Sequence, residues 1–437
     1  NIQIYNGQPV DDDSTTGFEG VSGLTAADTV EMNKRKLHWG LFDEQKRYFG
    51  EYDVKEEEVE PQEASKKKKI TPMNTAATIQ LPVIDTVTSK TMLSDLSARV
   101  TLGRGEDGTE PVLPSVAFFT LLHTHETLNC VSINADGALV AGGFSDSSIK
   151  LWNVVEQRFR SDKTDGANDD DDDVSNTAFR KLIGHAGPVY ALAFSVDSKW
   201  LLSASEDCTV RLWSTDTAQC VCVYREHNYP IWHVQFAPHG YYFATASHDR
   251  TARLWSTDRL TSLRVFVGHL SDVNAVEFHP NCAYVASVSS DKTARVFDIN
   301  TGQCVRLLTG HSGPLYSLAF SPDGKLLATG GDDTGVSLWD LASATRIVKL
   351  NGHTHTVWTL TFSKCCNMLA SGSHDRTVRL WDLKRVKADV EDETVVQTTT
   401  TTSPYLVKTL YTKRTPVHQL SFTRRNLLLG AGGFVPR

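Results

Sequence analysis

The sequence predicts an all-β protein built from repeated sheets that close into a ring, the architecture of a β-propeller. Two observations carry this prediction. Five histidines recur at intervals of 42 residues, and from about residue 111 onward the chain consists of short apolar runs separated by Gly, Asp, Ser and Pro. Degenerate copies of the same unit before and after these five bring the predicted number of sheets to seven, within residues 111–437.

Composition limits the function classes. The chain has 437 residues, with 44 Lys and Arg against 52 Asp and Glu, which gives a net charge of -8. Because nucleic-acid-binding domains are usually basic, we expect no strong direct binding to nucleic acid. No apolar run approaches the roughly 18 residues that would span a bilayer, so we expect no membrane partner. Eight cysteines without a framework spacing fit a reduced, intracellular compartment, and a start at Asn1 without a signal-peptide pattern predicts a processed or trimmed product.

Residues 1–110 are polar, charged and poor in β-branched runs. We expect residues 1–50 to be an extended segment with a few short helices, and residues 51–110 to be a charged linker. The propeller is therefore predicted to follow a mostly irregular or helical extension. The basic run Lys66–Lys69 fits either a solvated linker or a nuclear import signal.

A short helix is predicted at residues 91–100, within this linker. Its apolar positions Met92, Leu93, Leu96 and Val100 fall at helical spacing. An apolar stripe outside the propeller needs something to pack on, either a partner protein or the chain's own propeller. A loosely ordered linker is the alternative.

Each of the five regular repeats has a histidine, a hydroxyl 18 residues later, an aspartate 22 residues later and an aromatic 28 residues later. These positions are His185, Ser203, Asp207 and Trp213; His227, Thr245, Asp249 and Trp255; His269, Ser287, Asp291 and Phe297; His311, Thr329, Asp333 and Trp339; and His353, Ser371, Asp375 and Trp381. A catalytic triad is needed once, whereas this set recurs five times in register. We therefore interpret it as a buried structural network that fixes blade geometry.

In the expected network, the aspartate accepts a hydrogen bond from the histidine, the histidine donates to the hydroxyl, and the hydroxyl accepts from the indole N–H. Phe297 has no N–H, so we expect the network of its repeat to be incomplete.

The spacing and the dipeptides resemble the WD-repeat family. Four of the five histidines follow Gly, and three of the aromatics precede Asp, as in Trp339-Asp340 and Trp381-Asp382. The resemblance extends from about Pro114 to the end of the chain. It implies a seven-bladed WD40 β-propeller whose blades each have four antiparallel strands.

The flanking units complete the ring. Upstream, Asp146 and Trp152 mark a degenerate first blade, and downstream Thr415–Phe422 copies the start of a repeat. The strand Val116–Leu121 is expected to complete the last blade, because closure removes exposed strand edges. Two insertions are expected as loops between blades: an acidic one at 156–178 and a Thr-rich one at 386–405.

A second column of residues predicts a partner-binding rim. It lies five residues after each histidine, at the start of the innermost strand, and consists of Tyr190, Trp232, Asn274, Tyr316 and Trp358. Glu206, His248, Asp332 and His374, each just before a turn aspartate, are expected to lie beside it. Four aromatics at one rim are more than packing needs and are typical of protein contacts. A packed rim without a partner is the alternative.

No sequence motif indicates catalysis. The chain has no phosphate-binding loop, no nucleophile elbow and no histidines or cysteines at zinc-site spacing. We therefore expect a non-enzyme without a cofactor, a metal or a small-molecule substrate.

The two insertions, the segments Leu113–Thr120, His227–Trp232 and Gly268–Asn274, and the ending Phe422–Leu427 together resemble the subunit-five family of WD-repeat TBP-associated factors, shared by the general transcription factor TFIID and the SAGA coactivator. The resemblance implies a nuclear, non-enzymatic scaffold of RNA polymerase II transcription, whose propeller docks histone-fold TBP-associated factors and other subunits. It also implies that residues 1–50 are the end of that family's upstream helical domain, followed by its linker. Two alternatives are a propeller that reads histone tails or peptides and a substrate receptor of a ubiquitin ligase. The second often carries Trp-Asp-x-Arg, and this chain lacks that arginine.

Overall fold

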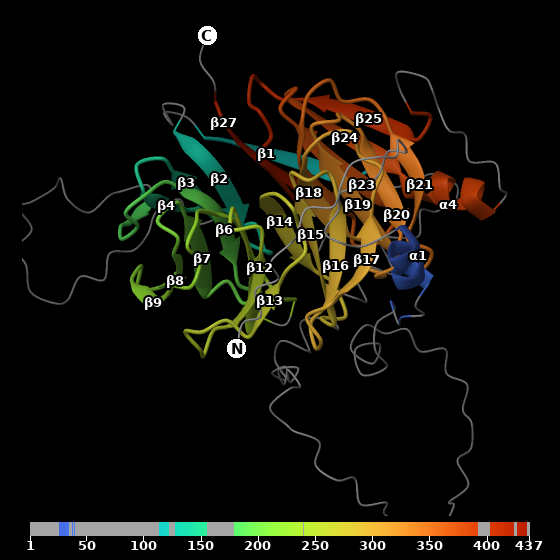
Figure 1. Ribbon diagram of the computed structural model, residues 1–437. Helices are drawn as coiled ribbons and strands as arrows, with labels where there is room; N and C mark the ends of the chain where they lie inside the picture. The colour runs from blue at the N-terminus through green and yellow to red at the C-terminus, as the bar shows by residue number, and fades with distance from the viewer. Residues whose placement is uncertain are drawn as a thin grey trace, which may run out of the picture.

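The structure is a computed structural model that describes residues 26–34, 37, 39, 113–121, 127–154, 179–238, 240–391, 403–423 and 426–434. Within these residues, seven separate sheets stand around a central axis (Figure 1), six with four strands and one with three. The predicted seven-bladed propeller is confirmed. We number the blades 1 to 6 in chain order from β2, and the three-stranded sheet is blade 7.

The second blade illustrates how the repeat forms. It consists of β6 (Val189–Phe194), β7 (Trp200–Ser205), β8 (Val210–Ser214) and β9 (Cys220–Tyr224), each paired antiparallel with the next. The middle strand β7 is buried from its second residue on, because neighbouring blades cover both faces of the sheet.

The other four-stranded blades follow the same order from the axis outward. They are β2 (Leu128–Ile133), β3 (Leu139–Phe144), β4 (Ile149–Asn153) and β5 (Arg180–Leu182) in blade 1; β10 (Ile231–Phe236), β11 (Tyr242–Ser247), β12 (Ala252–Ser256) and β13 (Arg264–Phe266) in blade 3; β14 (Val273–Phe278), β15 (Tyr284–Ser289), β16 (Ala294–Asp298) and β17 (Cys304–Leu308) in blade 4; β18 (Leu315–Phe320), β19 (Leu326–Gly331), β20 (Val336–Asp340) and β21 (Thr345–Leu350) in blade 5; and β22 (Val357–Phe362), β23 (Met368–Ser373), β24 (Thr377–Asp382) and β25 (Leu406–Tyr411) in blade 6.

Blade 7 joins the two ends of the propeller. It contains β26 (Gln419–Phe422), β27 (Leu427–Gly433) and, on its outer side, β1 (Ser115–Leu121). The predicted closure by the early strand is confirmed. The pairing of β1 with β27 is parallel, whereas all other pairs among the described strands are antiparallel. In a four-stranded up-and-down sheet, the second and fourth strands run in the same direction. Because β1 is parallel to β27, the second strand of blade 7, it has the direction of a fourth strand although it occupies the third position.

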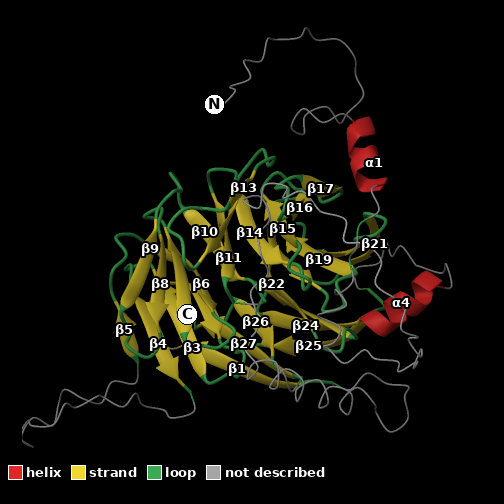
Figure 2. Cartoon of the chain, turned by 90° about the horizontal axis from the view of Figure 1, so that it is seen from below, coloured by secondary structure: helices red, strands yellow, loops and turns green. Residues whose placement is uncertain are grey.

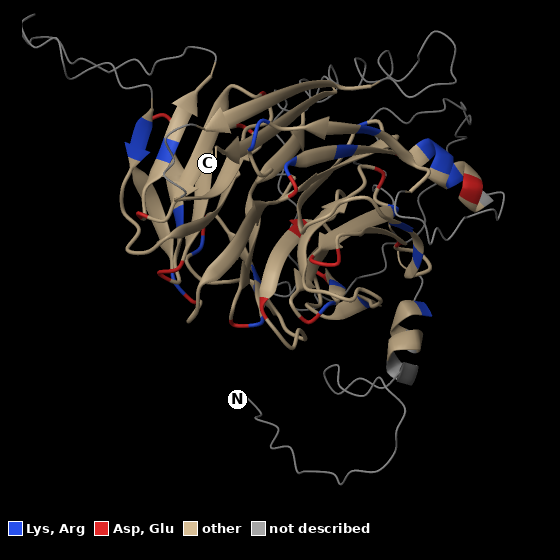
Figure 3. Ribbon diagram, turned by 90° about the horizontal axis from the view of Figure 1, so that it is seen from above, with Lys and Arg blue, Asp and Glu red and all other residues tan. Residues whose placement is uncertain are grey.

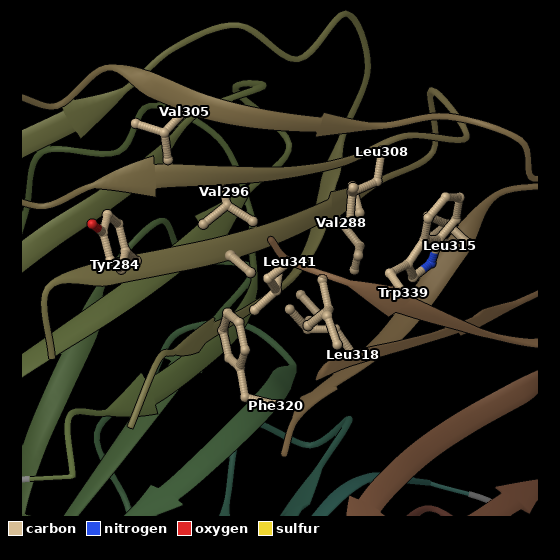
Figure 4. Close-up of a cluster of buried hydrophobic side chains, with 14 of the residues drawn as sticks. Tyr284, Val288, Val296, Val305, Leu308, Leu315, Leu318, Phe320, Trp339 and Leu341 are labelled. Carbon is tan, nitrogen blue, oxygen red and sulfur yellow. The ribbon is translucent and has the colours of Figure 1, made fainter. Parts of the chain in front are cut away.

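The core lies between blades. The cluster in Figure 4 joins Tyr284, Val296 and Val305 of blade 4 to Leu318 and Trp339 of blade 5. Similar clusters fill the other junctions, and each blade buries apolar side chains on both faces. The stability of each sheet therefore depends on its two neighbours.

In the described part of the chain, two helices lie outside the ring (Figure 2). Helix α1 (Ala26–Lys34) lies in the extension and contacts β17. Helix α4 (Leu383–Glu391) occupies the start of the Thr-rich insertion, where we had expected a loop. That expectation was wrong for residues 386–391, because Asp382 caps the helix by accepting from the Lys384 N–H at 2.8 Å and Leu383 and Val386 are buried one turn apart. No helix in the described part of the chain is long and apolar enough to cross a membrane.

Several expectations lie outside the described residues. They include the helix at 91–100 with Met92, Leu93, Leu96 and Val100, the linker 51–110, and the acidic insertion 156–178. In the Thr-rich insertion, residues 392–402 also lie outside.

Deletion of residues 114–122 should destabilise the whole propeller. Without β1, the edge of β27 loses its partner, and Phe118, which packs beside Gly430 and the blade 6–7 cluster, is lost with it. We expect a drop in Tm of at least several degrees, since a loss of 1 kcal/mol shifts Tm by about 2–4 °C in domains of roughly 150–250 residues. Thermal unfolding followed by circular dichroism measures it. An unchanged Tm would mean that β1 does not close the ring.

Candidate functional site

A tight turn between the second and third strands of each regular repeat organises the polar network. In blade 2, Asp207 Oδ1 accepts from the Thr209 N–H at 3.0 Å and from its hydroxyl at 2.7 Å. Cys208 between them has a φ of 62°, and the equivalent Arg250, Lys292, Thr334 and Arg376 are also in the left-handed region. Because such a backbone is unfavourable for these residues, the carboxylate bonds help to hold the turn.

The structure brings the four recurring groups together in every regular repeat. The histidine Nδ1 lies 2.7–2.8 Å from the aspartate Oδ2, and the histidine Nε2 lies 2.6–2.8 Å from the hydroxyl oxygen. The indole N–H donates to that oxygen at 2.8–3.0 Å where a tryptophan is present. The hydroxyl residues of the five networks have no exposed surface, so no substrate can reach them.

The protonation of the network follows from burial. Hydrogen bonds from His185, Thr209 and Ala186 hold the pKa of Asp207 far below its usual range despite the opposing effect of burial, and Asp291 and Asp375 behave alike. Burial lowers the pKa of His269 and His353. A neutral imidazole has one N–H, which points to the ionised aspartate, so its Nε2 must accept from the hydroxyl. For these two histidines we therefore infer that the second bond runs from the hydroxyl to the histidine, the reverse of the expected direction.

Two repeats lack one bond of the network. Phe297 of blade 4 offers no N–H to Ser287, although His269 keeps its bonds to Ser287 and Asp291 at 2.7 and 2.8 Å. In blade 5, Gly335 stands where other repeats have threonine, and Asp333 Oδ1 has no donor among the described residues.

The rim residues are grouped in two aromatic pairs. The rings of Tyr190 and Trp232 are 4.9 Å apart, and those of Tyr316 and Trp358 are 5.1 Å apart and nearly parallel. Trp358 keeps 46% of its surface exposed. Asn274 separates the pairs and points across to the next blade, where its amide donates to the Leu315 carbonyl at 2.6 Å.

The polar residues beside the rim are mostly engaged. Glu206 accepts from the Tyr190 hydroxyl at 3.3 Å, and His248 Nδ1 lies 2.8 Å from Asp272 Oδ2. Burial first, and then the charge of Asp332, raises the pKa of Tyr316. His374 faces His355, with ring centres 6.3 Å apart. Figure 3 shows that many of the acidic residues lie in the turns at the strand ends.

Sequence reasoning missed part of this surface. Tyr229 is 52% exposed and lies 5.6 Å from the His248 ring, and Leu270 is also exposed beside the fourth-blade histidine. The signal was available, since Tyr229 follows the repeat histidine by two residues. In blade 7 the rim position is His418, whose pKa burial and the nearby His374 lower to about 4.

Hydrogen bonds also join the innermost strands of neighbouring blades. His233 Nδ1 accepts from the Val276 N–H at 3.5 Å, and Glu277 accepts from the Phe320 N–H at 3.2 Å. Burial lowers the pKa of His233 to about 4 and raises the pKa of Glu277 to about 8. His233 is therefore neutral at pH 7, and Glu277 is mostly protonated.

No group of three or more His, Cys, Asp or Glu side chains in the described parts of the chain is placed to hold a metal ion. Among the described residues, the polar clusters that recur from blade to blade are the five buried networks, and the rim adds exposed aromatic and polar side chains. The chemistry that this arrangement supports is recognition through aromatic and hydrogen-bonding surfaces.

Replacing Ser371 by alanine should cost more stability than replacing Ser287. Ser371 serves both His353 and the Trp381 N–H, so its loss orphans two buried groups, whereas Ser287 serves only His269. We expect about 1–3 kcal/mol for Ser371→Ala and roughly 1 kcal/mol less for Ser287→Ala, measured by urea unfolding. Equal losses would show that the indole bond contributes nothing.

Glu277→Gln should make stability less dependent on pH. The folded pKa of Glu277 is about 8 and its ordinary value is 4.5, so the stability linked to its protonated form is complete below 4.5 and is lost as pH rises towards 8. The glutamine keeps an acceptor for the Phe320 N–H. We expect the variant to gain roughly 1–2 kcal/mol relative to the parent between pH 5 and pH 8, because the partly exposed side chain is screened by solvent. Parallel stability curves for the two proteins would contradict the assigned protonation.

Comparison with known proteins agrees with the repeat. The family "WD domain, G-beta repeat" matches residues 117–153, 176–214, 218–256, 260–298, 302–340 and 344–382, together more than half of the chain.

Similar proteins include transcription initiation factor TFIID subunit 5 of Arabidopsis thaliana, which is 42% identical over 33% of this chain and 22% of its own length. The protein of the same name from Drosophila melanogaster is 42% identical over 30% of this chain and 20% of its own length. The SAGA complex/transcription factor TFIID complex subunit Taf5 of Schizosaccharomyces pombe is 36% identical over 32% of this chain and 20% of its own length. This chain thus spans about a fifth of the length of these relatives. With its seven blades and recurring networks, the chain belongs to the WD40 repeat family.

Proposed function

We propose that this propeller is the protein-docking part of a non-enzymatic scaffold subunit in a nuclear transcription complex of the TFIID or SAGA kind. The observation that carries the proposal is the similarity to TFIID subunit 5 of a plant, an insect and, as a SAGA/TFIID subunit, a yeast, in a chain whose propeller presents an aromatic rim. Such a scaffold needs recognition surfaces and no reaction of its own.

The rim has the properties of an interface anchor. Trp358 is 46% exposed and is held flat against Tyr316, so little side-chain freedom is lost when a partner covers it. The Trp232 ring lies against Tyr190, with ring centres 4.9 Å apart, and forms the second aromatic pair of the rim. Large aromatic side chains of this kind dominate protein interfaces.

The proposed partners are a pair of histone-fold TBP-associated factors and neighbouring subunits, as the family resemblance implies. The apolar positions Leu93 and Leu96 of the linker are a proposed second contact, although they lie outside the described residues. In contrast, the run Asp169–Asp173 carries five like charges and is proposed to be dispensable.

A histone-tail reader is less well supported. A lysine or arginine ligand would need free carboxylates beside the aromatics. Glu206 already accepts from Tyr190, and Asp272 is paired with His248. A basic tail that bound to these two carboxylates would have to break these contacts.

The test is a pull-down of a recombinant histone-fold pair by the full chain, with Trp232→Ala plus Trp358→Ala as the rim variant. Two lost anchors should weaken binding by at least about tenfold, since hot-spot residues contribute about 2 kcal/mol or more each. Trp200→Ala is the matched control, because Trp200 is also a partly exposed tryptophan but begins the second strand of its blade, away from the rim.

Three further measurements test the linker contact, the acidic run and the histone-tail reader. Leu93→Asp plus Leu96→Asp should weaken binding if the linker contributes, and deletion of Asp169–Asp173 should leave it intact. Full binding by the rim variant, with its Tm unchanged, would eliminate the rim as the docking surface. A histone-tail peptide that binds the parent protein and competes with the pair would favour the reader.

A further inference from the structure

Part of the extension lies against the outer side of blade 4. Helix α1 ends beside β17, where the Asn33 side-chain amide donates to the Leu307 carbonyl and accepts from the Leu307 N–H, both at 3.2 Å. The Arg306 guanidinium donates to the Met32 carbonyl at 3.1 Å. One side chain thus satisfies the open edge of the outermost strand as a neighbouring strand would.

Trp39 closes the contact between blades 4 and 5. Only 7% of its surface is exposed, and its ring centre lies 4.8 Å from that of Tyr284. The Arg306 guanidinium lies 5.2 Å from the Trp39 ring, a cation–π contact. The Trp39 carbonyl lies so close to Gly324 that a Cβ there would be 2.5 Å from its oxygen. Trp39 is therefore part of the buried cluster of this junction, and it contacts Tyr284, which Figure 4 labels.

The surface under the segment, formed by Tyr284, Arg306 and Leu307, is called the seat here, and its exposure can be compared with that of equivalent positions in other blades. Leu307 is 4% exposed, whereas Val265, at the same position of blade 3, is 41% exposed.

The equivalent arginines of blades 3 and 4 also differ in exposure. Arg264 and Arg306 occupy equivalent positions, and each donates to a backbone carbonyl of the next blade, Asn300 or Leu341. Arg306 is 1% exposed and also donates to the Met32 carbonyl, whereas Arg264 is half-buried. What covers this seat in blade 4 is the chain's own segment 26–39.

We propose that residues 26–39 are an intramolecular strap that fixes the region before the propeller to the outer side of blades 4 and 5. The anchors are Asn33 and Trp39, and the seat is formed by Tyr284, Arg306 and Leu307. Arg306 and Leu307 lie on β17, the outermost strand of blade 4, and Tyr284 begins β15 at the strand end opposite the rim, whereas the rim residues lie on the innermost strands. Strap and rim are therefore separate surfaces that can be occupied together, and the proposal does not depend on the identity of the partner.

The first test is limited trypsin digestion of the full chain. Lys34, Arg35 and Lys36 lie between the two anchors, so docking should protect these cleavage sites. Trp39→Ala should increase cleavage there by about tenfold, as expected when an opening equilibrium shifts by about 1.4 kcal/mol. Trp200→Ala removes a tryptophan from the equivalent of the Tyr284 position and should leave the cleavage rate unchanged. An unchanged rate in Trp39→Ala would overturn the strap.

The second test keeps the tryptophan and measures hydrogen exchange at the Leu307 amide, which donates to Asn33. Asn33→Leu, of similar size, should increase exchange at Leu307 by about tenfold. The control Val30→Ala removes an exposed side chain of the same helix and should have no effect. Unchanged exchange in Asn33→Leu would overturn the strap even if Trp39→Ala fails to fold. Protection that grows with protein concentration would place the segment on a second copy and would also overturn an intramolecular strap.

Discussion

The ring depends on the pairing of β1 with β27, because no blade of this propeller is stable by its own core. Each sheet buries apolar side chains on both faces, and the covering surface comes from the two neighbouring blades. If blade 7 opened, blades 1 and 6 would each lose the cover of one face. The register from Ser115–Leu427 to Leu121–Gly433 therefore supports contacts all around the circle.

Closure imposes a second constraint. The polar turns and the indole N–H groups lie in the junctions between sheets, where they need hydrogen-bond partners. The His–Asp–hydroxyl–Trp network satisfies them, with the ionised aspartate at one end and the indole at the other. The same aspartates hold the turns, and the residues just before them are Glu206, His248, Asp332 and His374. The buried network thus fixes the backbone that presents the polar part of the rim, which links the stability of each blade to its proposed recognition surface.

How far the sequence predicts the structure depends on whether a feature repeats. The period of 42 residues predicts the blades, the closure and the partners within each network, because five copies in register leave few alternatives. Features that occur once gave no such signal. The helix after Asp382 looked like part of a Thr-rich loop, and Trp39 lies 245 residues before Tyr284 without any pattern that connects them. The direction of the histidine–hydroxyl bond required the burial of His353, which spacing alone does not provide.

Repeated blades are equivalent, so specific function has to come from the places where they differ. Blade 4 departs from the repeat at three positions: Asn274 replaces a rim aromatic, Phe297 replaces the tryptophan, and Glu277 is a half-buried carboxyl group. Two of these departures carry a compensating bond to blade 5, from Asn274 to Leu315 and from the Phe320 N–H to Glu277. The strap covers the outer side of the same blade and reaches blade 5 at Gly324. Blade 4 therefore separates the two aromatic pairs on the rim and carries the extension on its outer edge, and the polar bonds to blade 5 hold these two surfaces in a fixed relation.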